Sequence, residues 1–407
     1  MKNVLIITSQ FNEQDSVVTI SRNILEIYKK ILTIKLKTLV IEKLDLNTTD
    51  ISDFDFIVFI HPSAIVSANA NNLLVAINPQ KTSILFYLFG DYVRKSYFYL
   101  KLNDLLVGKK VHFFVASKSY LKLVQKSLSN KYACTVCPFP INLKNFKLNS
   151  LDRANFRQKH SFVKNDIVLT YTGRLSPQKN VLLLINTFKK VKQFGGLDTK
   201  LKLLIIGNID DFEAPTFYET KINPGDYYQL LRAEINLDPS IIHLPRLEIT
   251  ELRKAYAATD LFISLSLYHD EDFGYSPLEA LCMGTPLLVT NWGGYRDLIN
   301  IPGTNRAIEL LAVEYKNDSL LISQDELVDK LLISINKKRI QSSKLIKIRK
   351  KNSLFSIMQS YEKQLDTPFE VFAGFSENFF SLSLSILCED HAGIKDYAEF
   401  YNSFWSN

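Results

Sequence analysis

The sequence contains no apolar run that approaches the ~20 residues of a membrane-spanning helix, and its first run, MKNVLIIT, is too short for the core of a signal peptide. Cysteine is scarce, with four residues, and Cys134 and Cys137 form a single CxxC pair without the second pair or the neighbouring histidine of a zinc site. No G-x-G-x-x-G follows a predicted strand, which disfavours a Rossmann dehydrogenase. These absences predict a cytoplasmic globular protein without a structural zinc ion.

The charge balance is mildly basic, because 49 Lys and Arg residues oppose 42 Asp and Glu residues to give a net charge of +7. Such an excess suits an anionic ligand or an anionic membrane face, and it is too small to indicate a nucleic-acid partner. A chain of 407 residues exceeds what a single core usually holds, so we expect two domains.

Strand-like and helix-like segments alternate along the chain, and the pattern begins again after Pro138 and Pro140. The first set of short apolar runs is Lys2–Thr8, Thr38–Ile41, Phe54–Ile60, Ser83–Leu88 and Val111–Ala116. The second set is Ile167–Tyr171, Leu201–Ile206, Ile241–Leu244, Leu261–Ser266 and Pro286–Thr290. Such alternation predicts parallel sheets covered on both faces, and hence an α/β fold with two Rossmann-like doubly wound domains. Ligands of these sheets bind beyond the carboxyl ends of the strands, so two facing sheets would form a cleft.

The end of the chain differs from both sets, because residues 367–407 are rich in Phe, Tyr and Leu and are expected to be helical. The predicted domains are residues 1–145, residues 146–340, and a helical C-terminal segment, residues 341–407, that packs back on the first domain. Lys337–Lys351 carries eight Lys or Arg residues and no acid. We favour an exposed basic helix face for this run, and the alternative is a peripheral contact with an anionic membrane.

The segment Asp260–Gly294 carries the strongest functional signal. A buried strand leads into the acidic loop Asp270-Glu271-Asp272, which is followed by a turn with Gly274 and by a helix. The order Ser276-Pro277-Leu278-Glu279 predicts a capping box, with Ser276 as the cap and Pro277 as the first helical residue. The free N–H groups and the positive dipole end at such a helix start suit a phosphate.

A second signal lies in the turn TGRLSPQKN, residues 172–180, directly after the strand Ile167–Tyr171. The turn places Arg174 and Lys179 at the rim of the sheet, where the guanidinium fork and the ammonium could bind phosphate oxygens. The alternative is that both are solvated loop cations.

Together, TGRLSPQKN and EDFGYSPLEALCMGTPLLVTNWGG resemble the two signatures of retaining GT-B glycosyltransferases of the family 4 type, the glycosyl transferases group 1. The resemblance is strong over roughly residues 165–300, weaker over residues 1–150 and absent after about residue 350. It implies two Rossmann-like domains facing across a cleft, residues 1–145 on the acceptor side and residues 146–340 on the nucleotide-sugar donor side, with a helical C-terminal extension. It also implies a hexosyltransferase that moves a sugar, with retention, from a UDP- or GDP-sugar to a hydroxyl of a glycan or lipid-linked acceptor.

The resemblance also implies roles for individual residues. The implied donor-binding residues are Arg174, Lys179, Gly274, Tyr275, Ser276 and Glu279. Arg174 and Lys179 would neutralise the leaving diphosphate, Glu279 would accept hydrogen bonds from the ribose, and Glu271 would contact the donor sugar near the reacting carbon. The alternatives are that Glu279 only closes the capping box and that Glu271 is an ordinary loop acid.

The first domain departs from the family pattern, because the turn after the first strand, residues 9–13, contains no glycine and Phe89 stands where many members carry His. Asp91 is a candidate acceptor-side base, and the alternative is that it caps the next helix. We expect His61 to be a buried, satisfied histidine.

Two segments, Asp53-Phe54-Asp55 and Asp270-Glu271-Asp272, match the DxD pattern of metal-using glycosyltransferases. Because Arg174 and Lys179 can balance the diphosphate charge, we expect neither a metal ion nor a cofactor. Two alternatives remain open: a nucleotide-sugar epimerase or hydrolase of the same fold, and an inactive sugar-nucleotide-binding protein. We expect the protein in the cytoplasm, with Lys337–Lys351 as its candidate contact with the inner membrane face; the sequence does not predict its oligomeric state.

Overall fold

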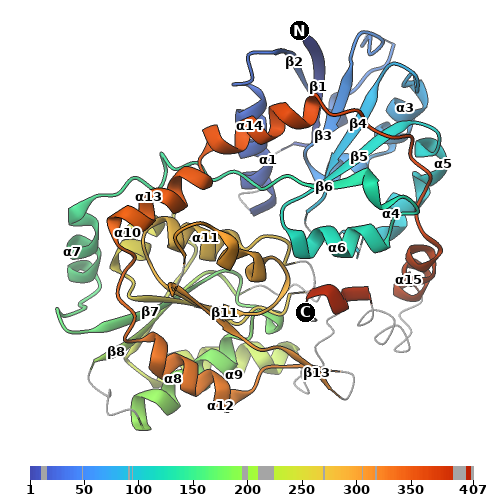
Figure 1. Cartoon of the computed structure of the whole chain (residues 1–407). Coiled ribbons are helices and arrows are strands. Elements are labelled where there is room, and N and C mark those ends of the chain that lie inside the picture. The colour runs from blue at the N-terminus through green and yellow to red at the C-terminus, as the bar shows by residue number, and fades with distance from the viewer. Residues whose placement is uncertain are drawn as a thin grey trace. The chain divides into compact units, whose positions relative to one another are not determined.

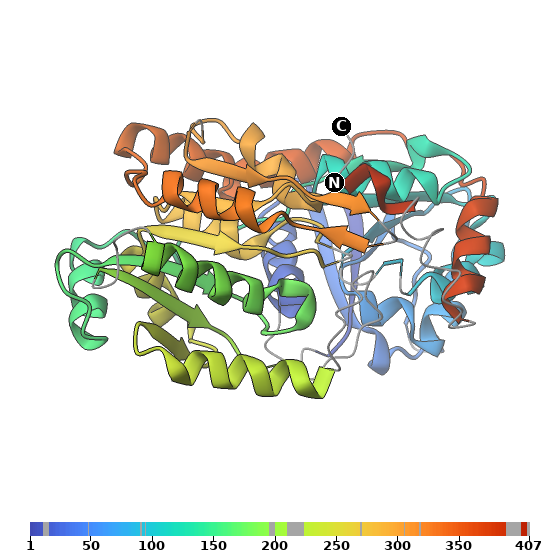
Figure 2. The ribbon, with the colours of Figure 1, turned by 90° about the horizontal axis from the view of Figure 1, so that it is seen from below.

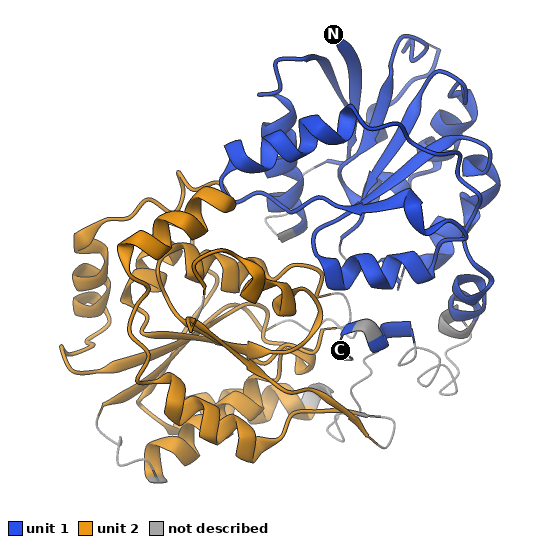
Figure 3. Cartoon of the chain, in the orientation of Figure 1, with its two compact units in different colours: residues 1–141, 352–404 blue, residues 142–351, 405–407 orange. Residues whose placement is uncertain are grey.

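The computed structural model describes residues 1–10, 16–47, 49–89, 92–93, 95–194, 200–209, 224–268, 271–304, 306–316, 319–387 and 400–404. These residues form two compact units (Figure 3). Unit 1 contains residues 1–141 and 352–404, and unit 2 contains residues 142–351. The chain therefore passes from one unit to the other near residue 141 and returns near residue 351.

Unit 1 is built on a six-stranded parallel sheet with the order β2-β1-β3-β4-β5-β6 (Figure 1). Its strands are β1 (Lys2–Thr8), β2 (Ile34–Val40), β3 (Phe56–Phe59), β4 (Ser83–Tyr87), β5 (Lys110–Val115) and β6 (Cys134–Val136). The central strands are almost continuously buried, as expected for a sheet covered on both faces. After β2 the chain returns to the other side of β1, so the topological switch point of unit 1 lies between β1 and β3.

The helices of unit 1 come from both ends of the chain. The N-terminal ones are α1 (Ser16–Tyr28), η1 (Ile41–Lys43), α2 (Pro62–Ile65), α3 (Ala68–Ala76), α4 (Ser96–Lys101), α5 (Asn103–Leu106), α6 (Lys118–Lys126) and η2 (Lys131–Ala133). The returning chain adds α14 (Leu354–Leu365), α15 (Glu377–Leu387) and η5 (Asn402–Phe404). Helix α14 packs on α1, where the rings of Tyr361 and Tyr28 are 5.8 Å apart, and Phe372 donates its N–H to Lys109 O at 2.8 Å. The described residues between 352 and 404 thus contribute to the core of unit 1.

Unit 2 contains a second six-stranded parallel sheet, with the order β12-β11-β10-β7-β8-β9. Its strands are β7 (Ile167–Thr172), β8 (Leu201–Ile206), β9 (Ile241–Leu244), β10 (Leu261–Ser264), β11 (Leu287–Thr290) and β12 (Ile308–Leu311), and a hairpin of β13 (Glu314–Lys316) and β14 (Ser319–Leu321) follows. The switch point of this sheet lies between β7 and β10. The prediction of two doubly wound α/β domains is therefore confirmed.

Helices cover both faces of the second sheet, with α8, α9 and α12 on one face and α10, α11 and α13 on the other (Figures 1 and 2). The helical segments of unit 2 are α7 (Ser150–Lys159), η3 (Pro177–Lys179), α8 (Val181–Phe194), α9 (Pro224–Leu237), α10 (Ile249–Ala258), α11 (Tyr275–Cys282), η4 (Gly293–Asn300), α12 (Gln324–Ser334) and α13 (Ser342–Lys351). Ser323 is the N-cap of helix α12, and its side chain accepts the N–H of Glu326 at 3.3 Å. The first face packs around Leu203, Leu231 and Leu331, which are all fully buried.

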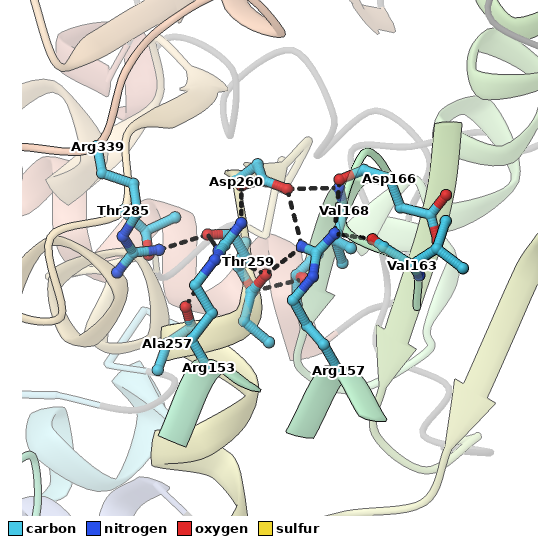
Figure 4. Close-up of polar contacts among 12 residues, drawn as sticks. Arg153, Arg157, Val163, Asp166, Val168, Ala257, Thr259, Asp260, Thr285 and Arg339 are labelled. Carbon is cyan, nitrogen blue, oxygen red and sulfur yellow. Dashed lines mark hydrogen bonds and ion pairs between the residues drawn. The ribbon is translucent and has the colours of Figure 1, made fainter. Parts of the chain in front are cut away.

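Arginine side chains fix the amino ends of the central strands of unit 2 (Figure 4). Arg153 Nη2 lies 2.6 Å from Asp260 Oδ1, and Arg157 Nη1 donates to Ala258 O at 3.1 Å. Asp260 Oδ2 also accepts the N–H of Val168, at the start of β7, at 2.9 Å. Because the last carbonyls of α10 carry the negative end of the helix dipole, guanidinium groups stabilise them there. This cluster holds β7 and β10 side by side beneath the switch point.

Candidate functional site

The turns after β7 and β10 meet at the switch point of unit 2. Leu267 donates its N–H to Gln178 O at 2.9 Å, and Asn180 Nδ2 donates to Leu265 O at 2.8 Å. Asn180 adopts the left-handed conformation, with φ 55°, which ends η3 and turns the chain into α8. The basic turn and the acidic loop predicted from the sequence therefore lie at the same edge of one sheet.

Lys179 and Glu271 form a buried ion pair at this edge. Lys179 Nζ lies 2.8 Å from Glu271 Oε2 and 3.0 Å from Ser266 Oγ. Ser266 Oγ donates to the same carboxylate oxygen at 2.7 Å. The side chains of Lys179 and Glu271 are only 13% and 11% exposed, so neither charge is well solvated. Burial lowers the pKa of Lys179, and Glu271 partly offsets that effect.

Arg174 joins this pair across the ring of Tyr268. Arg174 Cζ lies 5.1 Å from the ring centroid and Lys179 Nζ lies 4.7 Å from it, both within cation–π range. The carbonyl of Tyr268 accepts the indole N–H of Trp292 at 2.7 Å, which fixes the loop that carries the ring. Two cations are thus held close together, and the charge of Arg174 further lowers the pKa of Lys179.

The helix start differs from the predicted capping box. Helix α11 begins at Tyr275 with Gly274 as its N-cap, and glycine has no side chain that could cap the helix. The first helical bond is from Leu278 N to Gly274 O, at 3.1 Å. Gly274 has φ 82° and ψ 65°, a conformation that is open to glycine and that turns the chain into the helix two residues earlier than predicted. The interpretation of Ser276 as a cap is therefore wrong, and Glu279 lies too far along the helix to close a capping box.

Gly274 permits a close approach between the helix start and Tyr295. A Cβ atom on Gly274 would lie 2.5 Å from Tyr295 Cδ1, which is closer than any real contact. The hydroxyl of Tyr295 is 2.9 Å from Ser264 Oγ; burial raises its pKa well above the usual value, and the nearby charge of Glu271 raises it further. Gly294 donates its N–H to Glu271 O at 2.6 Å. The start of α11 and the Lys179–Glu271 pair are therefore parts of the same site.

Glu279 points from α11 toward the end of β7. It is 8% exposed, and its Oε2 accepts the hydroxyl of Tyr256 at 2.9 Å. The same hydroxyl lies 2.9 Å from Thr172 Oγ1, in the last residue of β7. Burial raises the pKa of Glu279 to about 8, although the hydrogen bond from Tyr256 opposes the shift. A carboxyl group of this kind gains or loses its proton close to neutral pH.

The remaining residues singled out from the sequence lie away from this site or outside the described residues. Asp91 and Asp270 lie outside the described residues. His61 is buried, and its Nδ1 accepts the N–H of Ser63 at 3.2 Å, so it caps α2. Cys134 and Cys137 are both buried, and burial raises the pKa of both thiols, which fits a structural role.

Within the described ranges, no group of three or more His, Cys, Asp or Glu side chains is arranged to hold a metal ion. In the same ranges, no helix combines the length and the apolar character needed to cross a membrane.

Several residues that shape this site were not singled out by the motifs. They are Thr172, Tyr256, Ser266, Tyr268 and Tyr295. Each is a common residue in an apolar segment or a loop, and each acquires its role only when the ends of β7, β10 and α11 come together. Their position just after a predicted strand or beside the two motifs is the signal that could have found them.

Comparisons with known proteins agree with this arrangement. The sequence model of the family described as "Glycosyl transferases group 1" matches residues 152–308. The matched segment contains both motifs on which the resemblance was based, so the resemblance to this family is confirmed there.

Two curated relatives are named as a lipopolysaccharide transferase and as a glycosyltransferase of capsular polysaccharide biosynthesis. The chain is 23% identical over 259 residues to the lipopolysaccharide 1,2-N-acetylglucosaminetransferase of Salmonella typhimurium, which corresponds to 63% of the chain and 62% of that protein. It is 25% identical over 180 residues to the capsular polysaccharide biosynthesis glycosyltransferase CapM of Staphylococcus aureus, or 44% and 42% of the two chains. The matches span 33% to 62% of the length of the curated relatives.

Solved structures match over more of the chain. HepE of Anabaena in complex with UDP superimposes with a TM-score of 0.64 at 15% identity, covering 90% of this chain and all (100%) of that one. WaaG, a glycosyltransferase involved in lipopolysaccharide biosynthesis, gives a TM-score of 0.57 at 13% identity, covering 90% and 100%. At these identities the likeness shows the fold alone. The two doubly wound units are those of the GT-B architecture, which confirms the predicted fold class.

Proposed function

We propose that the protein is a retaining, metal-independent glycosyltransferase of the hexosyltransferase type. It would move a sugar from a nucleotide-sugar donor to a hydroxyl group of a glycan or lipid-linked acceptor. The observation that carries this proposal is the grouping of Arg174, Lys179 and Glu271 beside the start of α11, at the switch point of the unit 2 sheet. This grouping lies within the segment that matches the glycosyltransferase family.

The cations and the helix start would bind the diphosphate of the donor. Arg174 and Lys179 supply two positive charges; Lys179 is largely desolvated and Arg174 is half-buried, so both would act more strongly on a nearby phosphate than fully solvated cations. The backbone N–H groups of Gly274, Tyr275 and Ser276 precede the first helical hydrogen bond, so they and the helix dipole face the same ligand. HepE was solved with UDP-glucose, which makes a UDP-sugar the first donor to test.

The two carboxyl groups would hold the remaining parts of the donor. Glu279 would accept hydrogen bonds from the ribose hydroxyls, because it lies on α11 above the end of β7. Glu271 would contact the donor sugar near its anomeric carbon. Its carboxylate is already fixed by Lys179 and Ser266, so its orientation does not have to be found during the reaction.

The proposed reaction breaks the bond between the anomeric carbon and the diphosphate oxygen and forms a bond from that carbon to the acceptor oxygen on the same face. Positive charge develops on the sugar ring and negative charge on the diphosphate. Arg174, Lys179 and the helix N–H groups would stabilise the diphosphate, and Glu271 would stabilise the ring. The acceptor proton would pass to the departing diphosphate or to a carboxylate such as Asp91. Because protein cations balance the leaving group, a divalent ion is not required by this scheme.

The basic run Lys337–Lys351 divides into two groups in the structure. Arg339 and Arg349 bind backbone carbonyls of unit 2, including Met283 O and Cys282 O, and Lys337 Nζ lies 3.1 Å from Glu309 Oε2. The exposed cations are Lys338, Lys344, Lys347, Lys350 and Lys351. These lysines form the candidate contact with an anionic membrane; co-sedimentation with anionic vesicles, compared with neutral ones, tests it.

Donor turnover separates the proposed transferase from its alternatives. Thermal-shift screening against UDP-, GDP-, ADP- and CMP-sugars identifies the donor, since a ligand of the folded form raises the melting temperature. Release of nucleotide that depends on an acceptor supports transfer. Acceptor-free isomerisation or hydrolysis indicates an epimerase or hydrolase, and binding without any turnover indicates an inactive binding protein.

A further inference from the structure

Unit 1 has a switch point of its own, between β1 and β3, that no part of the proposed donor site uses. Ligands of doubly wound sheets bind beyond the carboxyl ends of the strands at such points. The described residues at this edge include Ser9 and Gln10 after β1, Glu42 in η1 after β2, and His61 after β3. The hydroxyl of Ser21 on α1 donates to Ile60 O at 2.7 Å, which fixes α1 beside the end of β3.

A carboxylate of the chain itself binds the hydrogen-bond donors that follow β1. Glu42 Oε2 accepts the N–H of Gln10 at 3.2 Å, and Glu42 Oε1 accepts the hydroxyl of Ser9. Ser9 is buried, whereas the Glu42 side chain remains exposed. In a doubly wound sheet, the backbone N–H groups after the first strand are those that bind a ligand phosphate. Here they bind an anion that belongs to the chain, so a phosphate at this position would meet both repulsion and competition.

The turns that follow the first strands of the two sheets therefore differ in charge. The turn of unit 2 carries Arg174 and Lys179, whereas the described residues of the corresponding turn of unit 1, Ser9 and Gln10, bind the carboxylate of Glu42. Lys43 is also exposed, but in a 3₁₀ turn neighbouring residues point about 120° apart, so it does not share the direction of Glu42. A ligand that binds at this edge of unit 1 therefore has to make favourable contacts with a carboxylate.

A sugar hydroxyl is such a ligand. An ionised carboxylate has about four acceptor positions, and among the described residues Glu42 uses two of them, for Ser9 and Gln10. The remaining positions can accept hydroxyl protons, and charge-assisted bonds of this kind are about twice as strong as neutral ones. Because Ser9 and Gln10 hold the carboxylate in place, little side-chain entropy is lost when it binds a ligand.

We infer that the carboxyl edge of unit 1 binds an uncharged sugar through Glu42, and that this carboxylate selects against a phosphorylated one. The inference rests on the proposed function and names the substrate class of its acceptor: a sugar whose reacting end carries hydroxyl groups and no phosphate. Glu42 is a specificity-determining residue in this scheme and takes no part in the chemistry.

The test is saturation-transfer NMR on the full chain in saturating UDP. The probes are methyl glycosides of glucose, galactose, mannose and N-acetylglucosamine, each compared with its 6-phosphate. The wild-type chain should bind at least one neutral glycoside more tightly than its phosphate. Glu42→Gln should weaken the binding of that glycoside about fivefold, because a charged hydrogen-bond acceptor becomes neutral. Glu42→Lys should reverse the preference between the glycoside and its phosphate. The matched control is Glu26→Gln, which removes an exposed carboxylate of α1 paired with Lys29 and should change neither value.

The outcomes separate the two proposals. Three outcomes would overturn the inference and leave the proposed function standing. They are a wild-type preference for the phosphates, no signal from any neutral glycoside in a chain that binds UDP, and unchanged preferences in both Glu42 variants. Failure of the wild-type chain to bind any nucleotide would instead remove the proposed function, and the inference with it. Melting temperatures of the variants check that the fold is intact, and Glu42→Gln keeps the shape of the side chain.

Discussion

Replacing Glu279 by Gln should make unit 2 more stable at high pH while it weakens nucleotide binding. Burial raises the pKa of Glu279 from its ordinary value of 4.5 to about 8. Below pH 4.5 the carboxyl group is protonated in both the folded and the unfolded chain, so its ionisation does not change the free energy of unfolding. Between these two values the unfolded chain loses the proton while the folded chain keeps it, so the free energy of unfolding falls as the pH rises. Above pH 8 the group is ionised in both states, and the free energy of unfolding falls no further.

The size of the effect follows from the interval between the two pKa values. At about 1.4 kcal/mol per pKa unit, the wild-type chain loses about 5 kcal/mol of stability across the whole window. The neutral amide in the Glu279→Gln variant would resemble the protonated acid at every pH. Its stability relative to wild type should therefore rise by about 2 kcal/mol between pH 6 and pH 8. Urea unfolding of both chains at several pH values measures this difference. The control is Glu251→Gln, because hydrogen bonds from Lys254 and Lys159 lower the pKa of that carboxyl group and it stays ionised throughout this range.

Nucleotide affinity should change in the opposite direction. Ribose hydroxyls donate hydrogen bonds most strongly to an ionised carboxylate, so Glu279→Gln should weaken UDP binding about tenfold at pH 8.5 and much less at pH 6.5, where the wild-type group is protonated too. Calorimetric titration of UDP at both pH values provides the measurement, and titration of the UDP phosphates cancels between the two chains. A stability difference that stays flat with pH would refute the burial argument. An equal loss of affinity at both pH values would refute the contact between Glu279 and the ribose.

Three other substitutions probe the remaining parts of the donor site. Lys179→Met should destabilise unit 2 by about 3 kcal/mol in urea unfolding, because it leaves Glu271 buried without its partner, and adding Glu271→Gln should recover most of that loss; no recovery would contradict a direct pairing. Arg174→Ala should lower turnover about 100-fold and stability by less than about 1 kcal/mol, and comparable losses in both would mark Arg174 as a packing residue. Gly274→Ala should cost at least about 2 kcal/mol, since φ is 82° and the new Cβ would meet Tyr295; an unchanged melting temperature would contradict the required close approach.

The fold was predictable where strands are buried on both faces. The predicted run Leu201–Ile206 coincides with β8, because an interior parallel strand is a continuous apolar run with polar ends. The edge strand β2 was predicted as Thr38–Ile41 but spans Ile34–Val40. Its exposed lysines interrupt the apolar run, and pairing with β1 rather than burial decides where it begins.

The site was predictable only at the level of its motifs. The sequence alone predicted that one edge of the sheet carries Arg174, Lys179 and Glu271. The rule that places ligands beyond strand ends needs only the order of the elements. The start of α11 was predicted wrongly because Ser276 and Pro277 favour a cap and a first helical position, and this local preference was outweighed by the positive φ of Gly274. The hydrogen bond from Tyr256 to Glu279 and the packing of Tyr295 against Gly274 depend on tertiary structure, for which the sequence has no local signal.

The raised pKa of Glu279 also bears on how the donor site attracts a diphosphate. The charges that act on Lys179 are those of Glu271, Arg174 and Asp272. Together with Lys179 these groups sum to zero, so an ionised Glu279 would make the site net negative and would repel an approaching diphosphate. With a pKa of about 8, Glu279 is mostly neutral at pH 7 and leaves the two cations unopposed by a third acid. In the proposed donor complex, the ribose hydroxyls would favour the ionised carboxylate, so proton release would accompany binding. The group that would hinder approach would therefore become charged only after the diphosphate is in place.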